Sequence, residues 1–180
     1  MKKLTIFLIL CMSCSALSVA ANDVFSHKVA AKVAASQMPE FESKTCKFNQ
    51  SKYMTTSTVT LKSSGNFKFI KNQGVTFETT YPIHSENSYL ASHNKNINAI
   101  VKSVVNKNYT FVEKNFDIYF MKTSSDCWIL ALRPKENSPL KGDMRSLQIS
   151  GQTIGKDGLI QKMVIETINA TTTINFSQCG

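Results

Sequence analysis

Three histidines, His27, His84 and His93, are the side chains of this sequence best suited to moving a proton near neutral pH. His27 lies in a segment that predicts a helix, where a capping or solvent-facing role is expected, and the other two lie in a polar stretch. The sequence holds no Gly-x-Ser-x-Gly elbow, no Walker lysine, no glycine-rich phosphate loop and no paired acidic motif. We therefore expect no enzymatic activity and no cofactor.

Three cysteines, Cys46, Cys127 and Cys179, lie after the first 21 residues and can form a disulfide in an oxidising compartment. Three thiols allow one intramolecular pair in three ways and leave one thiol over, and the sequence does not choose among the pairs. Residues 22–180 contain no Cys-x-x-Cys or His-x₃-His spacing, so no metal site is predicted. No histidine is placed as a partner for a catalytic thiol.

The first 21 residues have the features of an export signal. Two lysines precede the apolar run 4–12, and small residues follow as far as Ala20 and Ala21. A charged start, an apolar stretch of about ten residues and an Ala-x-Ala-like end are typical of a secretory signal peptide. The run is shorter than the roughly 20 residues that a spanning helix needs. We expect residues 1–21 to be cleaved and the remainder to be exported to the periplasm.

Cys14 leaves a second interpretation open, in which a cysteine becomes the lipidated first residue. Met12 is bulkier than the residues expected just before such a cysteine. For the exported chain, residues 22–180, the length favours a single domain.

Charge bears on the partners of the protein. The formal net charge is +9, from 21 Lys+Arg and 12 Asp+Glu. This balance permits contact with anionic headgroups, for which Lys68, Lys71, Lys102 and Lys107 are candidates. Because the lysines are dispersed and the chain is predicted to be exported, we expect no nucleic-acid partner.

Helical periodicity appears in three segments. Residues 22–36 carry several alanines and apolar residues about four apart, and Pro39 follows, which predicts a helix that Asn22 or Asp23 caps. A short helical turn is expected at 109–113. The clearest stripe recurs at i, i+3, i+4, i+7 and i+8 and consists of Ile97, Ile100, Val101, Val104 and Val105.

Alternation with a period of two predicts strands over much of the rest. Residues 66–71 and 75–79 flank a turn at Asn72-Gln73-Gly74, which predicts an antiparallel hairpin with Gly74 at positive φ. The polar stretch 84–96 predicts at most short strands, around Tyr89 and Leu90. Further strands are expected at 45–52, 116–120, 128–132, 145–149, 159–166 and 171–176.

Many strands and few helices predict an α+β fold, in which the apolar face of the sheet must be covered. A strongly curved, incompletely closed antiparallel β-barrel (a half-barrel), with helices packed in its concave face, meets this need. The inward-facing residues either form an ordinary core or line a hydrophobic cargo cavity plugged by a mobile helix. The candidates are Phe67, Phe69, Val75, Phe77, Ile100, Val104, Phe116, Ile118, Phe120, Trp128 and Leu130.

The strand motifs follow one another in a distinctive order. Residues 48–82 match F-x-Q-x-K, then L-x-S-S-G-x-F-x-F, then G-x-x-F-x-T, and end in Tyr81-Pro82. Residues 116–134 hold Phe-Asp followed by W-x-L-x-L-x-P, and 164–176 hold V-I-E and T-I-x-F. This order resembles the LolA family, the periplasmic carriers of outer-membrane lipoproteins, over nearly the whole exported chain.

Two departures indicate a divergent branch of that family. Phe77 stands where the family has a tryptophan. No arginine occurs between residue 22 and Arg133, so the buried arginine that latches the lid of the best-known carriers has no visible counterpart.

The resemblance implies a monomer that shelters the acyl chains of a lipoprotein or related lipid while crossing the periplasm. It also implies a transient inner-membrane donor, an outer-membrane acceptor and a lid of helices. Each CH₂ removed from water contributes about 0.8 kcal/mol, so one acyl chain supplies ample driving force, and a lid that competes for the same wall permits release. The alternative is a non-catalytic sensor or interaction module on the same scaffold, which binds lipid or a protein partner.

Overall fold

The computed structural model describes residues 24–88 and 95–180. The predicted signal segment, the predicted caps Asn22 and Asp23, and Tyr89 and Leu90 lie outside the described residues. No helix in the described part is long and apolar enough to cross a membrane, and the described residues contain no group of three or more His, Cys, Asp and Glu able to hold a metal ion.

One sheet of ten strands joins the described part of the chain, in the order β1-β6-β7-β8-β9-β10-β2-β3-β4-β5, and neighbouring strands in it are antiparallel. The strands are β1 (Lys28–Val29), β2 (Lys44–Met54), β3 (Thr60–Ile70), β4 (Gly74–Tyr81), β5 (Ser85–Ser88), β6 (Phe116–Lys122), β7 (Cys127–Pro134), β8 (Met144–Ile154), β9 (Asp157–Thr167) and β10 (Ala170–Ser177).

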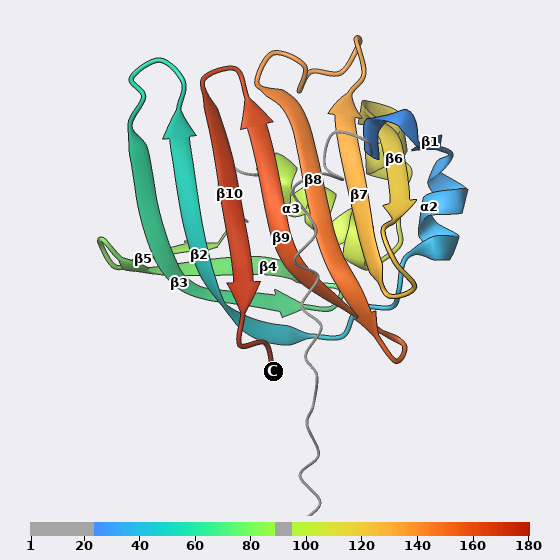
Figure 1. Cartoon of the computed structure of the whole chain (residues 1–180), viewed down its shortest axis with the longest axis horizontal. Helices are drawn as coiled ribbons and strands as arrows, with labels where there is room; N and C mark the ends of the chain where they lie inside the picture. Colours follow the sequence, from blue (N-terminus) through green and yellow to red (C-terminus); the bar gives the residue numbers. More distant parts are fainter. Residues whose placement is uncertain (1–23, 89–94) are drawn as a thin grey trace, which may run out of the picture.

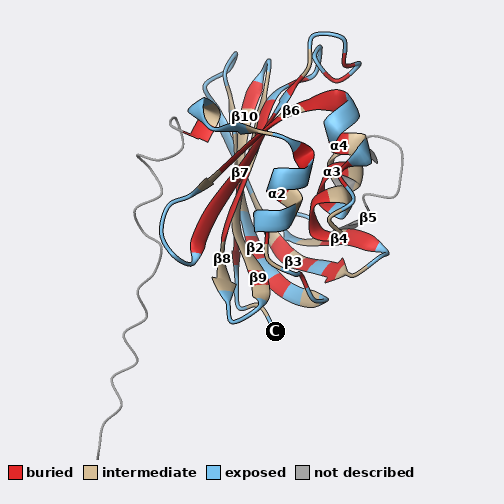
Figure 2. Cartoon of the chain, turned by 90° about the vertical axis from the view of Figure 1, so that its right-hand side faces the viewer, coloured by how far each residue is buried: buried red, intermediate tan, exposed pale blue. Residues whose placement is uncertain are grey.

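The sheet curves without closing, and its helices lie on the concave side (Figures 1 and 2). The helices are the 3₁₀ turn η1 (Val24–Ser26), α2 (Ala31–Gln37), α3 (Lys95–Val105) and α4 (Thr110–Asn115), and of these only η1 is packed on the outer face. Buried residues, red in Figure 2, follow the strands that surround the helices. The predicted fold class, a half-open antiparallel barrel with helices in its concavity, is confirmed.

The hairpin predicted around residues 72–74 is also confirmed. Strands β3 and β4 pair from Ile70 and Gly74 onward, and Gly74 has φ 129°, a value that favours glycine. Further along the pair the register shifts beside Gly65, where an added Cβ would overlap the backbone carbonyl of Glu78. Glycine therefore permits the close approach of β4 to β3.

The predicted helix at 22–36 is wrong in its first half. The chain forms η1, then the short strand β1 against β6, and becomes helical only from Ala31. Val24 packs with Tyr119 and Ile129 on the outer face of β6 and β7, whereas Ala31 packs into the core on the inner face. A single straight helix cannot reach both faces of the sheet, so the backbone extends between them.

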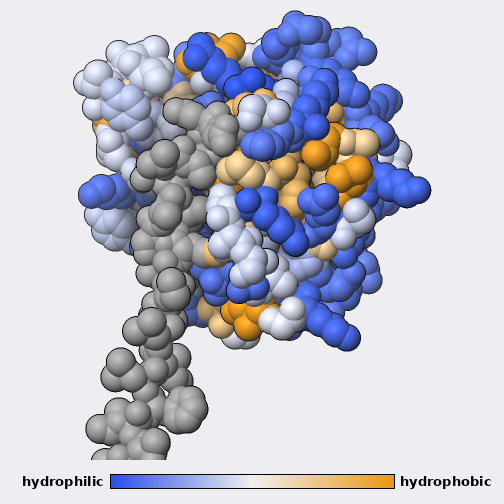
Figure 3. Space-filling view, turned by 45° about the vertical axis from the view of Figure 1, so that its right-hand side comes forward, coloured by the Kyte–Doolittle hydropathy of each residue, from blue (hydrophilic) through white to orange (hydrophobic). Residues whose placement is uncertain are grey.

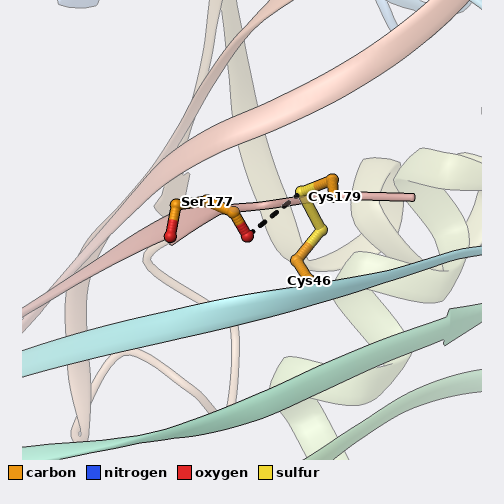
Figure 4. The surroundings of a disulfide bond; sticks show 3 residues. All are labelled: Cys46, Ser177 and Cys179. Atoms are coloured by element: carbon orange, nitrogen blue, oxygen red, sulfur yellow. Dashed lines mark hydrogen bonds between the residues drawn. A yellow bond between two sulfur atoms is a disulfide. The ribbon is translucent and has the colours of Figure 1, made fainter.

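The first long strand and the last one form the centre of the sheet. Strand β10 pairs with β2 over eight residues, from Ala170 opposite Met54 to Ser177 opposite Lys47. Beyond β10, Thr45 and Gly180 exchange two backbone hydrogen bonds of 3.0 Å, which brings Cys179 beside Cys46. These two cysteines form a disulfide, and the carbonyl oxygen of Ser177 lies 3.9 Å from Sγ of Cys179 (Figure 4).

Candidate functional site

All eleven residues proposed from the sequence as the cargo wall lie in one buried cluster on the concave side of the sheet. Their exposed fractions range from 0 % to 6 %. They come from five elements, β3, β4, α3, β6 and β7, and the strand residues share a face because alternate residues of a strand point to the same side. On the face that Figure 3 shows, hydrophobic residues (orange) lie among hydrophilic ones (blue), while the eleven wall residues themselves are buried.

Four phenylalanine rings make up the end of this wall that belongs to β10, β2, β3 and β4. Phe67 contacts Phe77 and Phe176, with ring centroids 4.9 and 4.7 Å apart. Phe48 meets Phe77 edge-on at 5.2 Å. Such pairs stabilise a core by about 0.5–1.5 kcal/mol beyond their burial. This end of the wall is therefore a rigid aromatic surface.

Helix α3 covers the wall with the apolar stripe that the sequence predicts. Ile100, Val101, Val104 and Val105 are 0–2 % exposed and belong to the same cluster as the phenylalanines. An apolar pocket of about 20 Å³ remains beside the helix, lined partly by Phe67, Phe69, Val101 and Val105. The chain's own helix thus fills the concave side beside these residues.

The C-terminal end of α3 is held by polar contacts at the surface. Lys107 Nζ lies 2.7 Å from Glu40 Oε1, and the backbone N–H of Asn72 donates to Oδ1 of Asn106 at 3.3 Å. The hydrogen bond and charge of Lys107 lower the pKa of Glu40. Since exposed ion pairs stabilise a protein by only about 0–1 kcal/mol, these contacts hold the helix far less strongly than its apolar stripe does.

Two buried polar groups in the cluster make no hydrogen bond to any residue of the described chain. They are the hydroxyl of Tyr109, which lies between α3 and α4, and the indole N–H of Trp128 on β7. Burial raises the pKa of Tyr109. An unpartnered buried polar group costs about 1–3 kcal/mol, so the wall carries two local sources of instability.

Sequence reasoning missed several members of the cluster. Phe41 packs edge-on against Trp128 with ring centroids 5.9 Å apart, but it lies in an irregular segment where no periodicity marks it. Phe48 and Phe176 were also not among the candidates, although both lie on predicted strands whose alternation places them on the buried face. Leu132, Leu147 and Ile149, each fully buried, were missed although they lie on predicted strands.

The fold and this apolar wall define a class of protein, namely half-open antiparallel barrels with helices in the concavity. No family model matches the sequence, and no curated protein matches it. Similar solved structures include a DUF1329 family protein from Desulfovibrio piger, which is 12% identical with a TM-score of 0.41, covering 83% of this chain and 89% of that one.

One of two other similar structures carries the family name that the sequence motifs suggest. A LolA superfamily protein from Nitrosomonas europaea is 8% identical with a TM-score of 0.39, covering 84% of this chain and 93% of that one. A domain assigned to outer membrane lipoprotein sorting, from Vibrio parahaemolyticus, is 9% identical with a TM-score of 0.38, covering 83% and 89%. These structures are likenesses of fold, and the function is argued below from the residues of this chain.

Proposed function

We propose that the protein is a non-enzymatic periplasmic carrier, exported by residues 1–21, which shelters the acyl chains of a lipoprotein or related lipid. The observation that carries this proposal is the placement of α3. A continuous apolar wall on a curved sheet is covered by α2, α3 and α4, and the eleven-residue α3 contributes the most buried apolar side chains, in a stripe that fills the space a lipid tail would take. The helix acts as the lid and leaves the wall when cargo binds.

The energies of the two occupants are of the same order. Burial of a Val or Ile side chain contributes roughly 1.5–3 kcal/mol, so the four buried residues of α3 together contribute about 6–12 kcal/mol. An acyl chain of about fourteen CH₂ groups contributes about 11 kcal/mol at 0.8 kcal/mol each. Because helix and cargo compete for one surface, the net affinity is modest, and a carrier needs modest affinity in order to release its cargo.

Delivery in this proposal runs from a transient donor at the inner membrane to an acceptor at the outer membrane, with the carrier acting as a monomer. Lys71 and Lys107 lie at the rim of the helix-covered wall, where each pairs with a glutamate. Either lysine can exchange its glutamate for an anionic headgroup or for an acidic partner surface.

The test is native mass spectrometry of the protein purified from the periplasm, with organic extraction of any bound material. We expect an acyl-bearing molecule, and uptake of a fluorescent fatty acid by the delipidated protein followed by its transfer to acceptor vesicles. If the protein carries no bound lipid and also takes up no fatty acid, it is not a carrier. Uptake without transfer, together with a retained protein partner, would instead indicate a sensor.

A further inference from the structure

A row of polar side chains crosses four neighbouring strands on the face of the sheet away from the core. Asn175 on β10 pairs with Asn49 on β2, Asn49 with Ser64 on β3, and Ser64 with Tyr81 at the end of β4. Asn49 directly follows the buried Phe48, so by strand alternation its side chain points away from the core. We call these four residues the outer polar row.

A pocket of about 390 Å³ lies over this row. It is within the size range of small-molecule sites, roughly 300–1,000 Å³. The residues that line it are Asn49, Gln50, Ser51, Lys62, Ser63, Ser64, Tyr81 and Asn175. By strand alternation Gln50 and Ser63 turn their side chains to the other face, where Nε2 of Gln50 donates to Oγ of Ser63 at 3.1 Å, so the other six carry the polar side chains of the pocket.

The outer polar row keeps its hydrogen-bonding capacity unused. Within the described residues, the side chains of Asn49, Ser64, Tyr81 and Asn175 make no hydrogen bond. The next row of the same face behaves differently. There Lys47 Nζ donates to Asn66 Oδ1 at 2.6 Å, and Asn66 Nδ2 donates to Glu78 Oε2 at 2.8 Å. The side chains of this second row thus bond to one another, whereas those of the row beneath the pocket are not satisfied from within the described part of the chain.

We propose that this pocket binds a saccharide that carries an anionic group. A sugar hydroxyl both donates and accepts a hydrogen bond, and amide side chains offer both functions side by side. The ring of Tyr81, in a residue that is 60 % exposed, offers an apolar face against the C–H groups of a sugar ring. Lys62 is the charged member of the lining and has no acidic neighbour within it, so it selects a phosphate or carboxylate on the sugar.

The composition of the pocket argues against a site for a bare anion. A phosphate held without a sugar is bound mainly by clustered cations or backbone N–H groups. Here one lysine stands among two outward-facing asparagines, two outward-facing serines and a tyrosine. The site is on the other face of the sheet from the proposed cargo wall, so it does not depend on the carrier function and can be tested separately.

The test is an NMR titration of the full exported chain with glucose 6-phosphate, glucuronate and N-acetylglucosamine 6-phosphate, compared with glucose and inorganic phosphate. We expect saturable shifts confined to the pocket with at least one acidic sugar. Asn49→Ala and Tyr81→Ala should each lower that affinity about tenfold, equivalent to roughly 1.4 kcal/mol. Lys62→Gln should lower the affinity for the acidic sugar toward the affinity for glucose.

Tyr53→Ala is the matched control, because Tyr53 is 43 % exposed, lies on the same face of β2 and is outside the pocket. It should leave sugar binding unchanged. The proposal is overturned if none of the three acidic sugars shifts pocket resonances, if Asn49→Ala and Tyr81→Ala bind as the parent does, or if phosphate alone binds as tightly as the sugar phosphates. Retained fatty-acid uptake in these variants keeps this outcome separate from the carrier proposal.

Discussion

Replacing Ile100 with alanine should destabilise the protein and strengthen acyl binding at the same time. Ile100 is fully buried at the centre of the α3 stripe. In the proposed carrier, α3 must leave the wall before an acyl chain can occupy it, so any loss of packing under the helix lowers the cost of that movement. A substitution that merely damages the binding site would lower stability and affinity together.

The magnitude follows from the burial of Ile100. Truncation of a fully buried isoleucine to alanine costs about 2–5 kcal/mol of the free energy of unfolding. Undocking of α3 exposes the same side chain, so the equilibrium between docked and undocked helix shifts by a comparable amount. Even 2 kcal/mol tightens the apparent dissociation constant of an acyl ligand about thirtyfold, since each 1.4 kcal/mol is tenfold.

Urea unfolding gives the stability, and titration with a fluorescent fatty acid gives the affinity. Ile129→Ala is the control, because Ile129 is 2 % exposed but packs in the second cluster, on the opposite face of the sheet. The Ile129→Ala variant should lose about as much stability as Ile100→Ala does, but it should bind the fatty acid with the affinity of the parent. If Ile100→Ala binds no more tightly than the parent, or if both variants tighten equally, then α3 does not compete with cargo.

Three further predictions concern the framework. Replacing Cys46 and Cys179 together by serine should lower the free energy of unfolding by up to about 5 kcal/mol, which is the chain-entropy value for a crosslink spanning 133 residues. Urea unfolding measures this loss, with the reduced parent protein as the comparison. Tyr109→Phe should raise stability by about 1–3 kcal/mol at neutral pH, because it removes an unpartnered buried hydroxyl. Burial raises the pKa of Tyr109 above the unfolded value near 10.0. As the pH rises above that value, the tyrosine ionises in the unfolded state before it does in the folded state, so the free energy of unfolding falls. This fall should be less steep in Tyr109→Phe. Gly65→Ala should lower the free energy of unfolding by roughly 2 kcal/mol or more, since the new Cβ would overlap the Glu78 carbonyl. Gly142→Ala, with open space around it, is the control and should change stability by less than about 0.5 kcal/mol. Equal effects of the two substitutions on the thermal midpoint would contradict the close approach of β3 and β4.

Local patterns predicted much of this fold because they act within a few residues. The period-two alternation around residues 66–79 and the stripe from Ile97 to Val105 each place apolar side chains on one face, and tertiary packing uses those same faces. The eleven wall residues were found in this way. Their shared burial followed from the sequence, although a role in binding cargo remains a proposal.

Features that depend on distant contacts were not visible in the sequence. The break between η1 and α2 arises because Val24 and Ala31 pack on opposite faces of the sheet. The choice of Cys46 and Cys179 among three pairings depends on β10 lying beside β2. Neither helical propensity nor cysteine spacing contains this information, because it is set by the order of strands in the sheet.

The seam between β2 and β10 has a consequence for the order in which the sheet can form. Without residues 170–177, the remaining strands fall into two separate groups, β2 to β5 and β1 with β6 to β9. No other described strand bridges these groups, so the complete concave face can form only once β10 has inserted between β9 and β2.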